Sequence, residues 1–399
     1  MSRLHLFAVP LALALGLLAV AALAGAERQE RFFPLLGFGF GPPPRAVPNT
    51  PCFTTNNLNG TCSSRRNCAG VTGGVPAGDC ARGLGVCCVV SLSCGTTSSA
   101  NFTYFTNPGY PGTYPGGGRC TITINKCAGV DQLRLDFLDL TLAQPDANGV
   151  CRSDFLSITG ASFAYPRICG VNAGNHMYVD FPAGTNSVVL SVDTDSTVRF
   201  ARVWNIRITQ IEATNPSHAP PGCLQYYQDT TGSVTSFNYG TTAATTMGAT
   251  PIGTREIANL DYMACVRPAA GYCSIEWSQL ADDPYSFTVS GDTSVLDATT
   301  LGTAFAALSG ITAATATQAA MLACDGDYVI IPSAIQNQVY TVGDRFCGNG
   351  FVTTTSVTKP FWLGVHTNNT ESGFPPTILP DIANRGFSLT YRQLPCPIF

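Results

Sequence analysis

The sequence predicts an all-β protein built from β-sandwiches. Apolar and polar residues alternate along several short segments, at 133–138, 155–159, 188–192 and 203–208. A strand with one face on the core and one in solvent has this period of two. Gly, Pro and Asn residues separate the segments, as turn residues do, and long amphipathic helical patterns are nearly absent. Many short strands at this spacing favour a sandwich.

The amino terminus has the features of a secretory signal peptide. Arg3 precedes an apolar run from Leu6 to Leu23, and Ala24-Gly25-Ala26 supplies the small residues that signal peptidase accepts. We expect residues 1–26 to be removed, so that a secreted, extracellular chain begins near Glu27. An uncleaved membrane anchor is the alternative. No later segment is long and apolar enough to span a bilayer.

Cysteine content and charge limit the classes of protein to which this chain can belong. The chain has 17 cysteines, all after the expected signal, which is typical of an oxidising compartment. Three N-glycosylation sequons agree with export and begin at Asn59, Asn101 and Asn368. The net charge is −4, from 21 basic and 25 acidic residues, and no basic run occurs. This balance argues against nucleic acid as a partner.

Composition divides the mature chain into segments. Residues 27–51 read as a Pro/Gly-rich leader, although their aromatic side chains offer a docking segment as the alternative. Residues 94–212 and 223–396 are rich in strand patterns, and a Pro-rich linker, 213–222, lies between them. Within the second region, residues 294–322 are rich in Ala and Thr and predict an insertion.

Residues 52–88 form a block with six cysteines in 37 residues: Cys52, Cys62, Cys68, Cys80, Cys87 and Cys88. The adjacent Cys87 and Cys88 cannot bond to each other without strain, so each needs a different partner. Zinc is the competing interpretation, but no Cys-x-x-Cys pair is present. We therefore expect a small disulfide knot.

Two halves of the strand-rich region share a cysteine pattern. The first half has Asn107-Pro108-Gly109-Tyr110-Pro111, then Cys151-Arg152-Ser153-Asp154 and Cys169-Gly170; the second has Cys324-Asp325-Gly326-Asp327 and Cys347-Gly348. These motifs resemble the CUB domain, an extracellular β-sandwich of the jelly-roll type. The fold class that follows is all-β, with tandem CUB-type domains after a small disulfide knot.

The CUB resemblance implies four disulfides: Cys94–Cys120, Cys151–Cys169, Cys223–Cys265 and Cys324–Cys347. We infer that the two cysteines left in the second half, Cys273 and Cys396, also pair. Cys127 then has no partner. A leftover thiol in a secreted protein suggests an intermolecular bridge, and hence a disulfide-linked dimer, or an unusual pairing. A buried free thiol is the alternative.

The six-cysteine block is similar to a clip domain, a module of arthropod extracellular proteins. That resemblance implies the pairs Cys52–Cys87, Cys62–Cys80 and Cys68–Cys88, although the gap between Cys68 and Cys80 is shorter than clip domains usually have. The whole layout resembles arthropod secreted proteins that contain CUB domains.

No catalytic motif stands out, and we assign no catalytic residues. The expected mature chain has three histidines, His176, His218 and His366, and lacks Gly-Asp-Ser-Gly-Gly, Gly-x-Ser-x-Gly and His-Glu-x-x-His. His176 lies in a strand-like segment and is expected to be structural. We therefore do not expect an enzyme.

Calcium is the one cofactor that the resemblance suggests. Many CUB domains bind calcium through a Glu and two Asp residues, and here Asp154 and Asp195 match the two Asp positions. The expected Glu falls near Ala143-Gln144, so one carboxylate of the set is missing. In the second domain only Asp327 can be matched. The alternative is that Asp154 and Asp327 cap loops by accepting hydrogen bonds from backbone amides.

These observations favour a secreted, non-catalytic binding or adaptor protein that acts through CUB domains. One hypothesis is a regulator in an extracellular protease or immune cascade, with extracellular proteins such as serine proteases or glycoproteins as partners. The alternative is a matrix or carbohydrate-associated structural protein, which the richness in Gly, Pro and Thr would fit.

Overall fold

The structure is a computed structural model. It describes residues 47, 49–242, 253–283, 286–289, 324, 326–341, 343–369 and 384–397. The expected signal peptide (1–26), most of the expected leader (27–51) and the Ala/Thr-rich insertion (294–322) lie outside the described residues.

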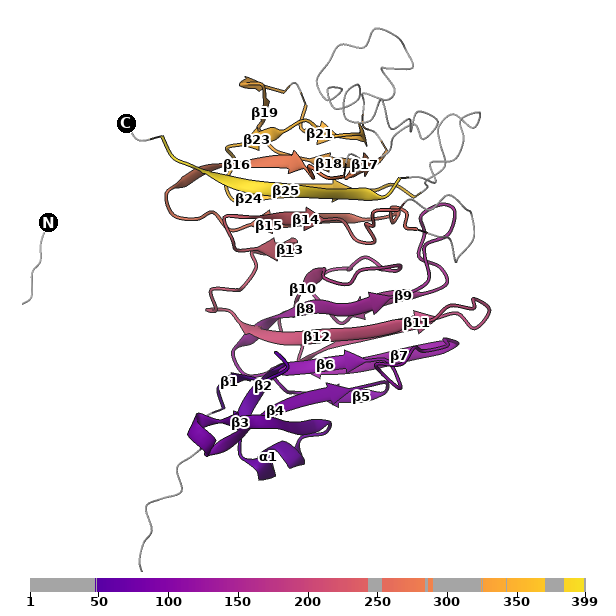
Figure 1. Cartoon of the computed structure of the whole chain (residues 1–399), viewed down its shortest axis with the longest axis vertical. Helices are drawn as coiled ribbons and strands as arrows, with labels where there is room; N and C mark the ends of the chain where they lie inside the picture. The colour runs from indigo at the N-terminus through magenta and orange to yellow at the C-terminus, as the bar shows by residue number, and fades with distance from the viewer. Residues whose placement is uncertain are drawn as a thin grey trace, which may run out of the picture. The chain divides into compact units, whose positions relative to one another are not determined.

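The first sandwich is built from β5 to β12 together with strands of the six-cysteine knot (Figure 1). One of its sheets has the order β1-β2-β4-β6-β12-β8-β10, with β3 paired to β4, and the other has the order β5-β7-β11-β9. Along β8, Leu133, Leu135 and Phe137 are all buried, and Trp204 and Ile206 of β12 lie beside them in the same core. The bounds are β5 (Thr96–Ser98), β6 (Phe102–Thr106), β7 (Gly118–Asn125), β8 (Val130–Thr141), β9 (Phe155–Thr159), β10 (His176–Asp180), β11 (Ser187–Thr194) and β12 (Val203–Glu212).

The six-cysteine knot continues into this sandwich. Its β4 is eight residues long and pairs in parallel with β6, through Ser91 opposite Tyr104 and Leu92 opposite Phe105. Its one α-helix is capped by Ser64, whose hydroxyl accepts a hydrogen bond from the Asn67 amide at 3.1 Å. The bounds are β1 (Pro51–Phe53), β2 (Asn59–Ser63), α1 (Arg65–Gly70), β3 (Gly74–Cys80), η1 (Ala81–Gly83) and β4 (Gly85–Leu92). Knot and sandwich, expected as separate segments, therefore share a sheet.

The second sandwich also has two sheets, with the orders β13-β15-β24-β18-β21 and β20-β19-β23-β16-β25-β17-β22; β14 pairs with β25. Its core is aromatic, with Trp277, Phe287, Phe361 and Phe387 fully buried. The bounds are β13 (Cys223–Tyr227), β14 (Thr231–Thr235), β15 (Asp261–Val266), β16 (Tyr272–Gln279), β17 (Phe287–Val289), β18 (Tyr328–Ile330), β19 (Ala334–Gln336), β20 (Val339–Tyr340), β21 (Arg345–Phe346), β22 (Gly348–Asn349), β23 (Thr354–Ser356), β24 (Phe361–His366) and β25 (Gly386–Pro395). The prediction of an all-β sandwich protein is confirmed.

Disulfides link strands within the knot and within each sandwich. The structure joins Cys52–Cys87, Cys62–Cys80, Cys68–Cys88, Cys94–Cys120, Cys151–Cys169, Cys223–Cys265, Cys273–Cys396 and Cys324–Cys347. These are the same partners that the sequence analysis assigned. Cys127 carries a free thiol.

Candidate functional site

The two sandwiches meet along a buried seam. The edge strand β10 of the first sandwich lies against the edge strand β13 of the second, and the Tyr226 amide donates to His176 Nε2 at 2.9 Å. Burial, aided by Arg134, lowers the pKa of His176 to about 4. The imidazole is therefore neutral at neutral pH and able to accept this bond.

The expected linker is itself part of the seam. Ala219 is fully buried, and its amide donates to Gln132 Oε1 at 2.8 Å, while Gln132 Nε2 donates back to the Ala219 carbonyl at 3.1 Å. Beside it, His218 Nε2 lies 3.0 Å from the Asp131 carboxylate. Residues 218 and 219 are thus bonded to β8.

The side chain of Asn238, from the second sandwich, makes four hydrogen bonds in the seam. Its amide nitrogen donates to Gln144 Oε1 and to the Arg255 carbonyl, both at 2.8 Å. Its oxygen accepts from Gln144 Nε2 at 3.1 Å and from the Val171 amide at 2.8 Å. Its own backbone amide donates to Asn172 Oδ1 at 2.8 Å. Asn238 is fully buried and has a φ of 62°, a conformation that Asn tolerates better than most residues.

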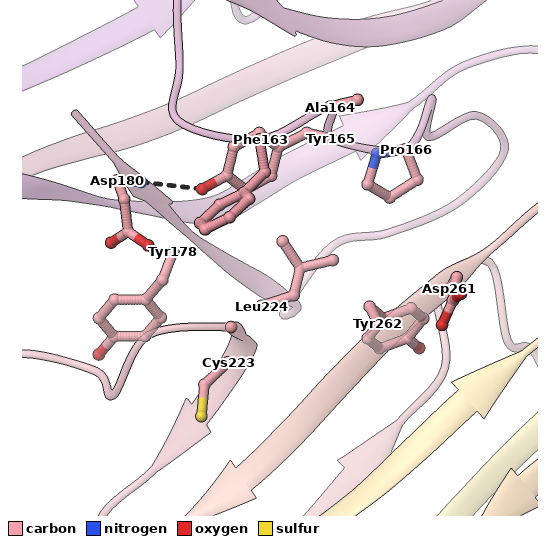
Figure 2. A pocket seen from close by; sticks show the side chains of 11 residues that line it. Phe163, Ala164, Tyr165, Pro166, Tyr178, Asp180, Cys223, Leu224, Asp261 and Tyr262 are labelled. Atoms are coloured by element: carbon pink, nitrogen blue, oxygen red, sulfur yellow. Dashed lines mark hydrogen bonds between the residues drawn. The ribbon is translucent and has the colours of Figure 1, made fainter. Parts of the chain in front are cut away.

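A pocket of about 220 Å³ opens on the seam, and Figure 2 shows the side chains that line it. Its walls combine aromatic and acidic side chains from both sandwiches. The first sandwich supplies the loop with Phe163 and Tyr165 and the strand β10; the second supplies β13 and β15. Phe163 is 60% exposed. An exposed aromatic residue at a concave junction between domains is typical of a binding surface.

The pocket has a carboxylate on each side of the seam. Asp180 of β10 accepts a hydrogen bond from Gln132 Nε2 at 2.7 Å, and its amide donates to the Tyr165 hydroxyl at 2.8 Å. Burial raises the pKa of Tyr165 to about 12, so that the hydroxyl stays neutral. Asp261 of β15 is exposed to solvent. The pocket can therefore offer negative charge beside aromatic walls, which suits a cationic group.

The residues suggested for calcium lie at another place in the first sandwich. Asp154 is almost fully buried, and its carboxylate is paired with Arg202 through Nε–Oδ2 at 2.7 Å and Nη2–Oδ1 at 3.0 Å. The same two oxygens also accept from the Ala143 amide at 2.9 Å and the Asp195 amide at 3.0 Å. Asp195 turns its own carboxylate to the Thr197 amide and hydroxyl, which lower its pKa.

These residues do not fit a calcium ion. Calcium takes six to eight oxygen ligands, and the guanidinium of Arg202 holds both oxygens of Asp154. Gln144, at the place of the missing Glu, faces Asn238 of the second sandwich. In this structure Asp154 caps two loops, as the alternative held, and pairs with an arginine that the sequence motifs do not indicate.

Asp327 of the second sandwich caps a loop in a similar way. Its Oδ1 accepts from the Asn368 amide at 2.6 Å, and burial raises its pKa to about 6. In the described part of the chain, no group of three or more His, Cys, Asp or Glu side chains is placed to hold a metal.

The three histidines contact a backbone group, a carboxylate and an aromatic ring, respectively. His176 bonds to backbone, His218 to Asp131, and His366 stacks on Tyr328 with ring centroids 4.8 Å apart. The expectation that His176 is structural agrees with its place in the seam.

The remaining predicted residues lie apart from the seam pocket. Asn101 is exposed, whereas Asn59 and Asn368 are half-buried; the Asn59 amide donates to the Tyr104 hydroxyl at 2.7 Å. Cys127 is half-buried, its Sγ lies 3.1 Å from the Ser99 carbonyl, and burial raises the pKa of its thiol. Across the described ranges, no helix is long and apolar enough to cross a membrane.

Comparisons with solved structures give partial overlaps. The CUB1-EGF-CUB2 domains of rat MASP-1 share 12% identity, cover 76% of this chain and 99% of that chain, and have a TM-score of 0.25. The CUB1-EGF-CUB2 domain of human MASP-1/3 shares 15%, covers 74% and 100%, and has a TM-score of 0.23. The MASP-1 CUB2 domain bound to Ca²⁺ shares 21%, covers 29% and 98%, and has a TM-score of 0.25. Because these TM-scores are low, we draw nothing from them about function.

Family comparisons are more direct. No curated protein matches the chain in sequence. Residues 94–207 match the CUB domain family, and residues 220–394 match the animal CUB domain family. Both matched ranges coincide with the two sandwiches, and the knot adds the N-terminal disulfide-rich region. The chain is therefore a protein with two CUB domains in tandem.

Proposed function

We propose that this is a secreted, non-catalytic binding protein that regulates an extracellular protease cascade as an adaptor. CUB domains suggest a binding or adaptor role, and many disulfides are typical of extracellular proteins.

The observation that carries the proposal is the seam pocket. It needs both CUB domains, since Phe163, Tyr165 and Asp180 come from the first and Leu224 and Asp261 from the second. A pocket with apolar walls and two carboxylates fits a basic side chain that has apolar neighbours in the partner protein. The tandem would then bind a protein segment across the seam, with its two domains held in one arrangement by Asn238 and His176.

The N-terminal knot supports the link to a cascade. Its pairing of Cys52–Cys87, Cys62–Cys80 and Cys68–Cys88 is the one that the clip-like resemblance implies. Three apolar side chains of the knot are largely exposed: Phe53 at 72%, Val75 at 55% and Leu84 at 54%. Such side chains offer a second contact surface for a larger assembly.

The test compares which proteins the natural chain and its variants capture from the extracellular fluid of the source organism. Residues 27–399 would be produced as a secreted, tagged chain, and retained proteins would be identified by mass spectrometry. Phe163→Ser and Asp261→Asn alter the pocket. Tyr340→Ser is the matched control, because Tyr340 of β20 is 63% exposed but lies outside the pocket.

The proposal expects a protease or protease-like protein to be retained by the natural chain and by Tyr340→Ser. Retention should fall about tenfold or more for each pocket variant, as truncation of a hot-spot residue costs roughly 2 kcal/mol. Equal retention by all four chains would show that the partner does not bind at the seam pocket. Retention of matrix proteins or glycans alone would favour a structural protein of the matrix.

A further inference from the structure

We infer that Arg202 is an internal cation that takes the place of calcium in the first CUB domain, so that the end of this domain is held together without a metal ion. Arg202 is fully buried one residue before β12, and a buried charge is tolerated only when it is paired and fully bonded.

All five N–H donors of the guanidinium are used. Nε and one hydrogen of Nη2 donate to the two oxygens of Asp154, at 2.7 and 3.0 Å. Nη1 donates to the Pro115 carbonyl at 2.5 Å and to the Phe200 carbonyl at 3.0 Å, and Nη2 also donates to the Asp195 carbonyl at 2.9 Å. The acceptors are thus one carboxylate and three backbone carbonyls.

This oxygen set has the chemistry of a cation site. Hard cations such as calcium bind carboxylates and backbone carbonyls together, and here one planar guanidinium bonds to all of them. The acceptors come from three separate segments, around Pro115, around Asp154 and at 195–200, so the arginine ties these loops together as a metal ion would.

The surrounding backbone leaves room for the arginine. Gly116 has a φ of 92°, and a Cβ at this position would lie 2.4 Å from Arg202 Nη1. A glycine is therefore required at position 116 for two reasons: the backbone is in the left-handed region, and a side chain would collide with the guanidinium. The carboxylate that would complete a calcium site is replaced by Gln144, which bonds to Asn238 across the seam. At this end of the first domain, Asp154 and Gln144 therefore both bond to other residues of the chain.

The experiment measures melting temperature in excess calcium and in EGTA for three chains. Arg202→Ala removes the guanidinium and leaves the oxygens of Asp154, Pro115, Phe200 and Asp195 without their cation. Arg119→Ala is the matched control, because Arg119 also pairs with an aspartate, Asp193, but its side chain is 70% exposed. All disulfides remain intact in the three chains.

The natural chain and Arg119→Ala should melt within about 2 °C of each other, since exposed ion pairs contribute little. Arg202→Ala should melt about 10 °C lower in EGTA, as expected for breaking a buried pair. Calcium should raise the melting temperature of Arg202→Ala more than that of the natural chain, and methylguanidinium should do the same. An equal calcium effect in all three chains, or none in Arg202→Ala, would overturn the inference.

If Arg202→Ala does not fold, a second measurement on the natural chain tests the same inference. In the natural chain labelled with ¹⁵N-arginine, the Nε–H of Arg202 should exchange slowly with solvent, and Arg202→Lys identifies its signal. The inference expects this signal to be the same in calcium and in EGTA. A calcium-dependent shift or loss of the signal would show that the metal enters the corner and would overturn the inference.

Discussion

The buried side chain of Asn238 allows a quantitative test of how firmly the two CUB domains are joined. Asn238→Ala removes four side-chain hydrogen bonds, two with Gln144 and one each with Val171 and Arg255. Leaving a buried polar group unpaired costs about 1–3 kcal/mol. With three partners affected, and some relief from water entry, we expect a loss of about 3–5 kcal/mol in the free energy of unfolding.

The backbone adds a smaller cost that must be separated from the hydrogen bonds. Asn238 has a φ of 62°, and an alanine in this region costs about 1 kcal/mol more than an asparagine. Asn337→Ala is the matched control, because Asn337 has a φ of 48° and is exposed. Any loss shared by the two variants belongs to the backbone, and the excess in Asn238→Ala belongs to the seam.

The assay is differential scanning calorimetry of the disulfide-bonded chain, combined with limited proteolysis at 213–222. Asn238→Ala should lower the first melting transition by about 10 °C relative to the natural chain. It should also speed cleavage near Ala219, whose fastening to Gln132 depends on a closed seam. If Asn238→Ala behaves like Asn337→Ala in both measurements, the seam does not hold the domains and the reasoning is wrong.

Four further predictions concern the titration of His176 and Asp327, the free thiol and glycosylation. Burial lowers the pKa of His176 to about 4 from its usual 6.5, so the unfolded chain takes up this proton first as the pH falls. Between pH 6.5 and pH 4, measured by urea unfolding, the natural chain should therefore lose about 3 kcal/mol more stability than His176→Gln does, because the variant lacks this proton uptake. Asp327 acts with the opposite sign: burial raises its pKa to about 6, so its protonation in the folded chain stabilises as the pH falls, and Asp327→Asn should lack that gain. Burial raises the pKa of the Cys127 thiol, so Ellman's reagent should label it more slowly in the folded chain than in urea; equally fast labelling would contradict this, and a dimer that reducing agent dissociates would support the intermolecular bridge. Asn101 is exposed, so we expect it to carry a glycan in the secreted chain. The mass that glycosidase removes should therefore be smaller for Asn101→Gln than for the natural chain, by the mass of one glycan.

The strands and the cysteine pairs could be anticipated because their signals are local or belong to a family pattern. In β8, alternate residues such as Leu133 and Leu135 are buried, because a strand with one face on the core must alternate. The cysteine motifs carried the expectation of CUB domains, which the family matches at 94–207 and 220–394 confirm. Periodicity did not reveal that the knot shares a sheet with the first domain, because parallel pairing of β4 with β6 leaves no pattern in the sequence.

The seam between the domains and the role of Arg202 could not be predicted from the sequence, because both depend on residues far apart along the chain. Arg202 and Asp154 are 48 residues apart, and Asn238 and Gln144 are 94 residues apart. Nothing in either residue's neighbours along the chain indicates its partner, since only the tertiary fold brings them together. The one available signal was the glutamine in place of the expected Glu, which pointed to a changed site but not to what had replaced it.

The most direct test of the account is capture of a partner from extracellular fluid in calcium and in EGTA, with the natural chain and Phe163→Ser side by side. The account predicts a partner whose retention is equal in calcium and EGTA and is lost in Phe163→Ser, because the seam pocket binds it and Arg202 makes the first domain independent of the metal. A partner that is lost in EGTA and retained by Phe163→Ser would contradict both the proposed binding surface and the role of Arg202.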